Sequence, residues 1–224
     1  MTSREKANKK YKYIIYMQKL FLFGAGGHCK QVIDIFKQDT DLTICGIFDD
    51  YSQKKDHYGY PILGTINNAV SLSNIYGDAR FFCTIGDNIF REKICSQFDK
   101  TKFINCIHPK SNISDSVKIG LGNYIGAFTN ILGDSVIGDF NILNDGAQLP
   151  HDSLIGNYNH VSINASLGGN VRVGNYNLIG LNSTILPKIT IGDNITVGAG
   201  TVVHRDIKES CTVVGNPYRI IKKN

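Results

Sequence analysis

Residues 131–155 read ILGDSVIGDFNILNDGAQLPHDSLI, with an aliphatic side chain at every sixth position. The same spacing runs unbroken from Ile107 to Val203 through seventeen hexapeptides, and glycine follows the aliphatic residue in nine of them. A helix repeats its apolar face about every 3.6 residues and a half-buried strand about every two, so neither explains a period of six. A period of six is typical of a solenoid whose hexapeptides form the sides of a triangular coil, with the aliphatic residues pointing inward. The segment therefore predicts a prism of nearly six coils.

The stretch before the repeat has a different pattern. A short apolar strand at 20–23 ends in Gly24-Ala-Gly-Gly27, and a helix with Val32, Ile33 and Phe36 on one face follows. Further strands are expected at 43–48, 61–64 and 80–85, and further helices at 68–74 and 88–98, the last with Ile89, Ile94 and Phe98 inward. Strand, glycine turn, helix and strand form a βαβ unit, which predicts a small parallel sheet.

Composition and charge exclude several classes of protein. The 224 residues are 42% apolar and 19% charged, as in a soluble globular protein. The net charge of +5 lies within residues 1–19, so the folded body has no basic footprint for nucleic acid. No apolar run reaches the roughly 18–20 residues that span a membrane. Six scattered cysteines without a CxxC pair predict reduced thiols in a cytoplasmic protein.

His151-Asp152 interrupts the repeat with a polar ring directly after Pro150. A histidine can take the proton of an amine or hydroxyl that attacks a thioester, and a neighbouring carboxylate can hold the imidazole in one tautomer. From the residues alone, the pair is equally compatible with an exposed corner histidine. His108, His151, His160 and His204 lack the close spacing of a zinc site, so no metal is expected.

The glycine loop that ends at His28 is the candidate phosphate site, because it follows a strand and opens a helix. It departs from GxGxxG, which would require glycine at Cys29, and this argues against NAD. Asp49 and Asp50 end the second strand and would meet the base or ribose, or else form a solvated turn. The expected substrate-binding residues are Gly24, Gly26, Gly27, His28, Asp49, Asp50, Gly86, Asn88, Arg91 and Asn144.

Eight short segments together resemble the left-handed parallel β-helix acyltransferases, within the subgroup that carries an N-terminal Rossmann-like domain and acetylates amino sugars or sialic acid. The resemblance covers residues 17–224. Its segments are LFGAGGHC (22–29), FDD (48–50), IGDN (85–88), HD (151–152), NHVS (159–162), GGN (168–170), GAGTVV (198–203) and GNPYR (215–219).

The resemblance implies that His151 is the general base and that Asp152 orients it. It implies that His160 meets the acetyl end of acetyl-CoA and that the glycines let pantetheine approach the backbone, although they could equally be turn glycines. Lys188, with His204 and Arg205, could meet the phosphates of the coenzyme or be solvated corners. The expected acetyl-CoA-binding residues are His160, Gly168, Gly169, Gly198, Ala199 and Lys188.

We therefore expect a basic flexible extension (1–18), a Rossmann-like nucleotide-sugar-binding domain (19–106), a left-handed β-helix (107–208) and a C-terminal segment (209–224). The expected activity is direct N-acetylation, by acetyl-CoA, of the 4-amino group of a UDP-, dTDP- or GDP-linked 4-amino-4,6-dideoxy sugar. The resemblance also implies a homotrimer with sites between subunits. The alternatives are a sialic acid O-acetyltransferase, which needs no diphosphate pocket, and a non-catalytic structural solenoid.

Overall fold

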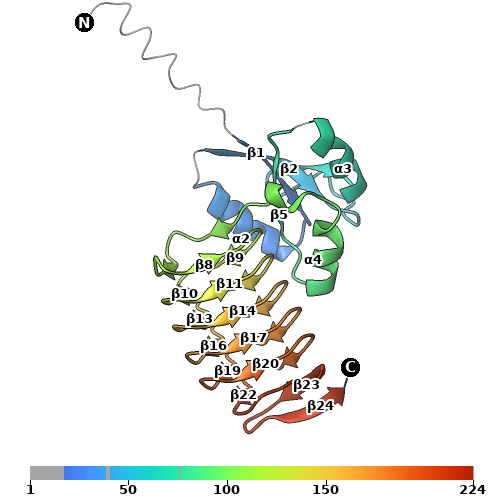
Figure 1. Ribbon diagram of the computed structural model, residues 1–224. Helices are drawn as coiled ribbons and strands as arrows, with labels where there is room; N and C mark the ends of the chain where they lie inside the picture. The colour runs from blue at the N-terminus through green and yellow to red at the C-terminus, as the bar shows by residue number, and fades with distance from the viewer. Residues whose placement is uncertain (1–17, 39–40, 76, 224) are drawn as a thin grey trace, which may run out of the picture.

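The computed structural model describes residues 18–38, 41–75 and 77–223. An α/β domain lies at one end of a long prism of stacked coils, and the C-terminal strands lie at the other end (Figure 1). The predicted basic extension lies outside the described residues, apart from Gln18, which begins the first strand. No helix in the described part of the chain is long and apolar enough to cross a lipid bilayer.

The α/β domain contains a five-stranded mixed sheet. Its order is β3 (Asp56–His57), β4 (Tyr60–Gly64), β2 (Leu42–Phe48), β1 (Gln18–Phe23) and β5 (Arg80–Cys83). All neighbouring strands are parallel except β3 and β4. The helices are α2 (Gly27–Phe36), α3 (Ile66–Ile75), α4 (Asn88–Cys95) and the short 3₁₀ helix η1 (Lys100–Lys102).

The helices bury the faces that their sequences predict, with one exception. Val32, Ile33 and Phe36 of α2 are buried, as expected. The prediction that Ile89 faces inward is wrong, because its side chain is 56% exposed while Ile94 is buried. Arg91 takes the inward position on that part of α4, and the helix ends at Cys95, before Phe98.

The prism consists of seventeen two-residue strands in three faces, and the strands within each face are parallel. The first face contains β6 (Cys106–Ile107), β9 (Tyr124–Ile125), β12 (Ile142–Leu143), β15 (His160–Val161), β18 (Leu178–Ile179) and β21 (Thr196–Val197). The second contains β7 (Asn112–Ile113), β10 (Asn130–Ile131), β13 (Gln148–Leu149), β16 (Ser166–Leu167), β19 (Thr184–Ile185) and β22 (Val202–Val203). The third contains β8 (Lys118–Ile119), β11 (Val136–Ile137), β14 (Leu154–Ile155), β17 (Arg172–Val173) and β20 (Thr190–Ile191).

Stacked strands pair eighteen residues apart, as Asn112, Asn130 and Gln148 do, which makes three hexapeptides one coil. The aliphatic residues from Ile125 onward are buried along the axis, whereas Ile107 at the first coil is 38% exposed. This arrangement confirms the predicted fold class, an α/β domain followed by a β-helix.

An asparagine ladder binds successive coils together at the corner between the third and first faces. Asn141 Oδ1 accepts hydrogen bonds from the backbone N–H and the Nδ2 of Asn159, at 2.8 and 3.0 Å, and Asn141 Nδ2 donates to the carbonyl of Gly156 at 2.8 Å. Asn123, Asn159 and Asn177 repeat the same pattern. The side chains are fully buried, so each one satisfies backbone groups that water cannot reach.

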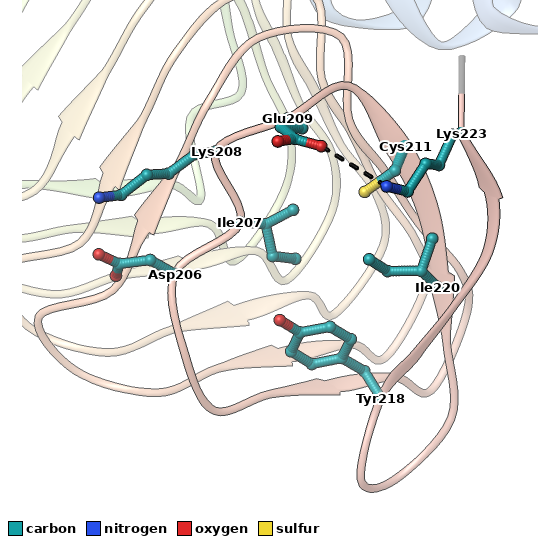
Figure 2. A pocket seen from close by; sticks show the side chains of 8 residues that line it. All are labelled: Asp206, Ile207, Lys208, Glu209, Cys211, Tyr218, Ile220 and Lys223. Carbon is teal, nitrogen blue, oxygen red and sulfur yellow. Dashed lines mark ion pairs between the residues drawn. The ribbon is translucent and has the colours of Figure 1, made fainter.

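The end of the chain covers the last coil. β23 (Cys211–Val214) extends the first face, and β24 (Arg219–Lys223) folds back antiparallel to it. A cavity of about 240 Å³ lies beneath this hairpin, and a Glu209–Lys223 ion pair at its rim spans 3.8 Å. Figure 2 shows the side chains that line it, among them Tyr218, Ile220 and Ile207. Tyr218 and Ile207 belong to the prism core, so the hairpin closes its end.

Candidate active site

The corner between the second and third faces carries His151 and Asp152, between β13 and β14. Asp152 has a φ of +59°, a left-handed conformation that aspartate tolerates better than most residues. His151 Nδ1 donates a hydrogen bond to Asp152 Oδ2 over 2.7 Å, and the His151 side chain is 68% exposed. The bond fixes the tautomer and leaves Nε2 to accept a proton, which is the arrangement of an oriented general base.

Glycines lie one coil before and one coil after His151 in the same corner, at Gly133 and Gly169. A Cβ at residue 169 would lie 2.7 Å from His151 Nε2, so the position of the imidazole requires glycine there. A Cβ at Gly168 would instead lie 2.6 Å from the backbone of Pro187 in the next coil. Gly169 therefore leaves room for the ring of His151, whereas Gly168 leaves room for the backbone of the next coil.

The predicted acetyl-CoA residues lie in three different places: His160 is on the first face, in β15, and the others are at two edges of the prism. Lys188 is exposed in the His151 corner, and its backbone N–H donates to the Gly169 carbonyl at 3.0 Å. Gly198 and Ala199 follow β21, in the corner between the first and second faces. The structure thus brings Lys188 and Gly169 to the edge that carries His151 and leaves Gly198 and Ala199 on another edge of the same chain.

His204 and Arg205 follow β22 and pack against the ring of Tyr218. Arg205 Nε donates to the Tyr218 hydroxyl at 3.2 Å, and the His204 and Tyr218 ring centroids are 5.1 Å apart. Both side chains are exposed, so the guanidinium of Arg205 and the imidazole of His204 lie at the surface near the end of the prism.

The predicted phosphate loop joins β1 to α2. A Cβ at Gly26, Gly27 or Gly86 would meet nothing within 4 Å, so these three glycines border open space. Gly26 is the N-cap of α2 and carries no side-chain cap, which leaves the first backbone N–H groups of the helix directed at that space. A helix start of this kind suits a phosphate group. Gly24 has a φ of +101° and makes the sharp turn out of β1.

Asp49 and Asp50 hold the neighbouring loops in place. Asp49 Oδ2 accepts a hydrogen bond from the Ala25 backbone at 2.7 Å, and its Oδ1 accepts one from the Ser52 backbone at 2.7 Å. Asp50 Oδ1 accepts from the backbone of Ile66 at the start of α3, at 2.8 Å. Asp49 therefore ties the glycine loop to the end of β2, Asp50 ties the start of α3 to it, and contact of either with a base or ribose stays a prediction.

Two histidines meet at the interface between the domain and the first face. His28 Nδ1 lies 3.0 Å from Gln31 Oε1, and its ring packs edge-on against Tyr124 with centroids 4.5 Å apart. Burial lowers the pKa of His28, and burial, with the nearby charge of Arg91, lowers the pKa of His160 to about 4. Nε2 of both residues is buried without a hydrogen-bond partner among the described residues. Both imidazoles are therefore neutral at pH 7, and each can serve a ligand.

Arg91 and Asn88, both expected at the substrate, link the α/β domain to the prism in the structure. Arg91 Nε donates to the carbonyl of Phe140 at 2.9 Å, and its four remaining N–H groups bond Ile85, Gly86, Asn88 and Asn159. Asn88 Oδ1 accepts from Arg91, and its Nδ2 donates to Asn177 at 3.0 Å. All five guanidinium protons are used inside the protein, so the side chain has no donor for a ligand.

A cavity of about 200 Å³ lies between α2 and the corner between the first and second faces. Asp145 lines it together with Tyr124 and Gln31, and its Oδ1 accepts the backbone N–H of Ala127 at 2.9 Å. Asn144 Oδ1 accepts a hydrogen bond from the backbone N–H of Asp145 at 2.9 Å, so its side chain stabilises the turn at this corner.

Sequence analysis did not single out Asp145 or Tyr124. One signal was available for Tyr124, because the outward position of the first face is apolar in three successive coils, at Cys106, Tyr124 and Ile142. All three are buried against the α/β domain. An apolar run at outward positions indicates a covered face. No comparable signal marks Asp145.

Within one chain the two halves of the predicted site do not meet. His28, Gly86 and His160 gather where the α/β domain covers the first face. His151 lies at the corner between the other two faces, which is the edge of a triangular prism opposite the first face. The glycine loop is therefore separated from His151 of the same chain by the body of the prism.

Comparison with known proteins identifies relatives of both parts. The family model for the PglD N-terminal domain matches residues 19–98. A perosamine N-acetyltransferase from Caulobacter crescentus, solved as a histidine variant in complex with CoA and GDP-perosamine, is 33% identical with a TM-score of 0.83. The match covers 90% of this chain and 96% of that one.

Two curated relatives match over part of their length. An uncharacterized protein, L142, of Acanthamoeba polyphaga mimivirus is 47% identical over 124 residues, which are 55% of this chain and 24% of that protein. The UDP-N-acetylbacillosamine N-acetyltransferase of Bacillus subtilis is 32% identical over 117 residues, which are 50% of this chain and 52% of that protein. The chain thus spans about half or less of the curated relatives it matches.

Proposed function

The chain belongs to the PglD family of hexapeptide-repeat sugar N-acetyltransferases, and from this premise we propose that it acetylates the 4-amino group of a nucleotide-linked 4-amino-4,6-dideoxy sugar with acetyl-CoA. The observation that carries the proposal is the oriented His151–Asp152 pair, 2.7 Å apart, set against Gly169. The Bacillus subtilis relative is named for a UDP-linked sugar, and the Caulobacter crescentus enzyme was solved with a GDP-linked one. The proposal therefore does not choose among UDP, dTDP and GDP as the nucleotide of the substrate.

The chemistry is direct transfer between two bound substrates. The sugar amine attacks the thioester carbonyl, the C–N bond forms, and the C–S bond breaks to release the thiolate of CoA. His151 Nε2 takes the proton that the amine loses and returns a proton to the thiolate, so no covalent enzyme intermediate is needed. Asp152 stabilises the imidazolium through Nδ1, and placing both substrates in contact supplies much of the rate.

The glycine loop and the prism divide the recognition of the two substrates. The open backbone at Gly26, Gly27 and Gly86 holds the diphosphate, and the neutral His28 contacts the substrate beside it. The prism edge at Gly169 and Lys188 receives the coenzyme. Both substrates are cytoplasmic metabolites, so the reaction takes place in the cytoplasm.

A homotrimer completes the active sites. Support comes from the exposed edge on which His151 lies and from the opposite position of the glycine loop in the same chain. In a trimer, the edge of one prism approaches the α/β domain and the Gly198 corner of its neighbour, so base, coenzyme and nucleotide sugar converge between chains. Sedimentation equilibrium at micromolar protein tests this arrangement, and a monomer that retains full activity would overturn it.

The activity is tested by thiol release from acetyl-CoA with a panel of UDP-, dTDP- and GDP-linked 4-amino sugars and free sialic acid. We expect turnover with one nucleotide-linked amino sugar, and its loss in His151→Ala. Asp152→Asn keeps the left-handed turn and should lower kcat by about 100-fold with little change in either KM. Turnover only with sialic acid would favour O-acetylation, and an inert protein that binds no CoA would favour a structural solenoid.

A further inference from the structure

Arg91 is a buried cation that connects the α/β domain to the prism. Its side chain lies on α4 and is only 1% exposed. Two of its hydrogen bonds cross to the prism, from Nε to the Phe140 carbonyl at 2.9 Å and from Nη2 to the Asn159 carbonyl at 3.2 Å. Two others hold the turn after β5, from Nη1 to the carbonyls of Ile85 and Gly86 at 2.9 and 3.1 Å.

The positive charge of Arg91 has no ion-pair partner among the described residues. Asp87, the N-cap residue of α4, accepts the backbone N–H of Phe90 at 2.7 Å, and Glu92 within the helix accepts a hydrogen bond from the Tyr176 hydroxyl at 2.7 Å. Carbonyl oxygens therefore solvate the guanidinium in place of water. An uncompensated buried cation is costly to keep, so a role beyond packing would explain its presence.

The residues beside Arg91 are those that border the open space at the domain interface. The Gly86 carbonyl accepts a hydrogen bond from Arg91, the Gly86 backbone also faces the imidazole of His160, and Asn159 immediately precedes His160. One guanidinium thus fixes the Gly86 turn from one domain and the start of β15 from the other. Arg91 reaches both without a donor left for a ligand.

We propose that Arg91 is a positioning residue that locks the Gly86 turn against His160, so that a nucleotide sugar meets a preformed pocket between the two domains. The proposal rests on the proposed function for the identity of that ligand. Because the pocket is already ordered, little conformational entropy is lost when the ligand binds, and the affinity for the ligand is higher.

Burial is the main cause that lowers the pKa of His28 and of His160, and the charge of Arg91 adds to it in both. The two histidines face each other, and the other polar or charged groups around them are Gln31 on α2, Arg91 on α4 and Asp145 on the prism. The titratable groups that face Arg91 are Cys83, Cys95, Asp87 and Tyr158. Among these, Arg91 is the only permanent cation, so its removal should let His160 take a proton at higher pH.

The test compares Arg91→Lys and Arg91→Met with Tyr176→Phe in the full chain. Tyr176 donates to Glu92 Oε1 at 2.7 Å and links the same two domains without contacting Gly86 or His160, so its variant controls for a weakened interface. The readouts are kcat/KM for the nucleotide sugar, thermal stability, and the NMR titration of His160. The titration needs no turnover, so it tests Arg91 even if the proposed activity fails.

Arg91→Lys keeps the charge but loses the planar set of donors, so we expect kcat/KM for the nucleotide sugar to fall about tenfold or more while the His160 titration stays in place. Arg91→Met should raise the pKa of His160, while burial still holds it below the ordinary value. If Arg91→Met does not fold, the kinetics of Arg91→Lys decide the question. A lysine variant no slower than Tyr176→Phe, or a His160 titration that Arg91→Met leaves unchanged, would overturn the proposal.

Discussion

The imidazole of His151 lies against the backbone of Gly169, eighteen residues later in the same corner of the prism. A Cβ at position 169 would lie 2.7 Å from Nε2 and 2.8 Å from Cε1 of that ring. Real Cβ contacts are not this short, so any side chain at 169 displaces the imidazole. The stacking of one coil on the next therefore couples a glycine to the placement of the proposed base.

Gly169→Ala should reduce activity without unfolding the protein. Its methyl group pushes the His151 ring away from the reacting amine, and a displacement of about 1 Å can cost about 100-fold in rate. Gly133→Ala is the matched control. Gly133 lies in the same corner, one coil before His151, and the only atom within 4 Å of a Cβ there would be Ser116 Oγ, at an ordinary contact distance of 3.5 Å. Steady-state kinetics and thermal melts on both variants make the comparison. Equal activity in the two would show that His151 is not the base or that its ring moves freely.

Gly27→Ala should weaken binding of the nucleotide sugar selectively. The added methyl enters the open space next to the start of α2 and obstructs the diphosphate, while alanine favours the helix more than glycine does. We expect KM for the nucleotide sugar to rise about tenfold, with the melting temperature and the KM for acetyl-CoA unchanged. Lys30→Ala, on the exposed side of the same helix, controls for changes to α2. A parallel rise in both KM values would contradict a phosphate site at this loop.

The sequence predicted most of the fold because a period of six admits few structures. The aliphatic positions from Ile125 to Val203 are buried as expected, and the family suggested by the motifs is confirmed by the relatives. The error at Ile89 has a physical cause: the sequence of α4 does not reveal that its inward face meets backbone carbonyls of the prism, which favour Arg91 over an isoleucine.

The site was less predictable than the fold. The roles of Arg91 and Asn88 depend on contacts 49 to 89 residues away in the chain, with Phe140, Asn159 and Asn177, and local sequence carries no trace of them. The geometry of His151 over Gly169 likewise arises only once the coils stack. Residue type and spacing could indicate a base and a phosphate loop, but not that they lie on opposite sides of one prism.

Asn141→Ala should destabilise the prism. The change removes the acceptor of the Asn159 backbone N–H and leaves that group buried and unpaired. We expect a loss of about 3 kcal/mol in the free energy of unfolding, measured by urea denaturation. Asn112→Ala removes an exposed side-chain bond on the second face, to Asn130 at 3.1 Å, and should cost far less. Equal losses would mean that the ladder contributes no more than a surface contact.

His160 should make the folded protein less stable as the pH falls from about 6.5 to about 4. Its pKa is lowered from 6.5 to about 4 by burial, so over this range the unfolded chain binds the proton and the folded chain does not. Above the range both states are neutral, and below it both are charged, so the contribution changes only within it, by at most about 1.4 kcal/mol per pH unit. Urea denaturation of the wild type and His160→Asn across pH 4.5–7.5 measures the difference, with the exposed His204→Asn as control. The two variants should diverge as the solution is acidified, since only His160→Asn removes a buried imidazole, and parallel curves would place His160 in contact with water.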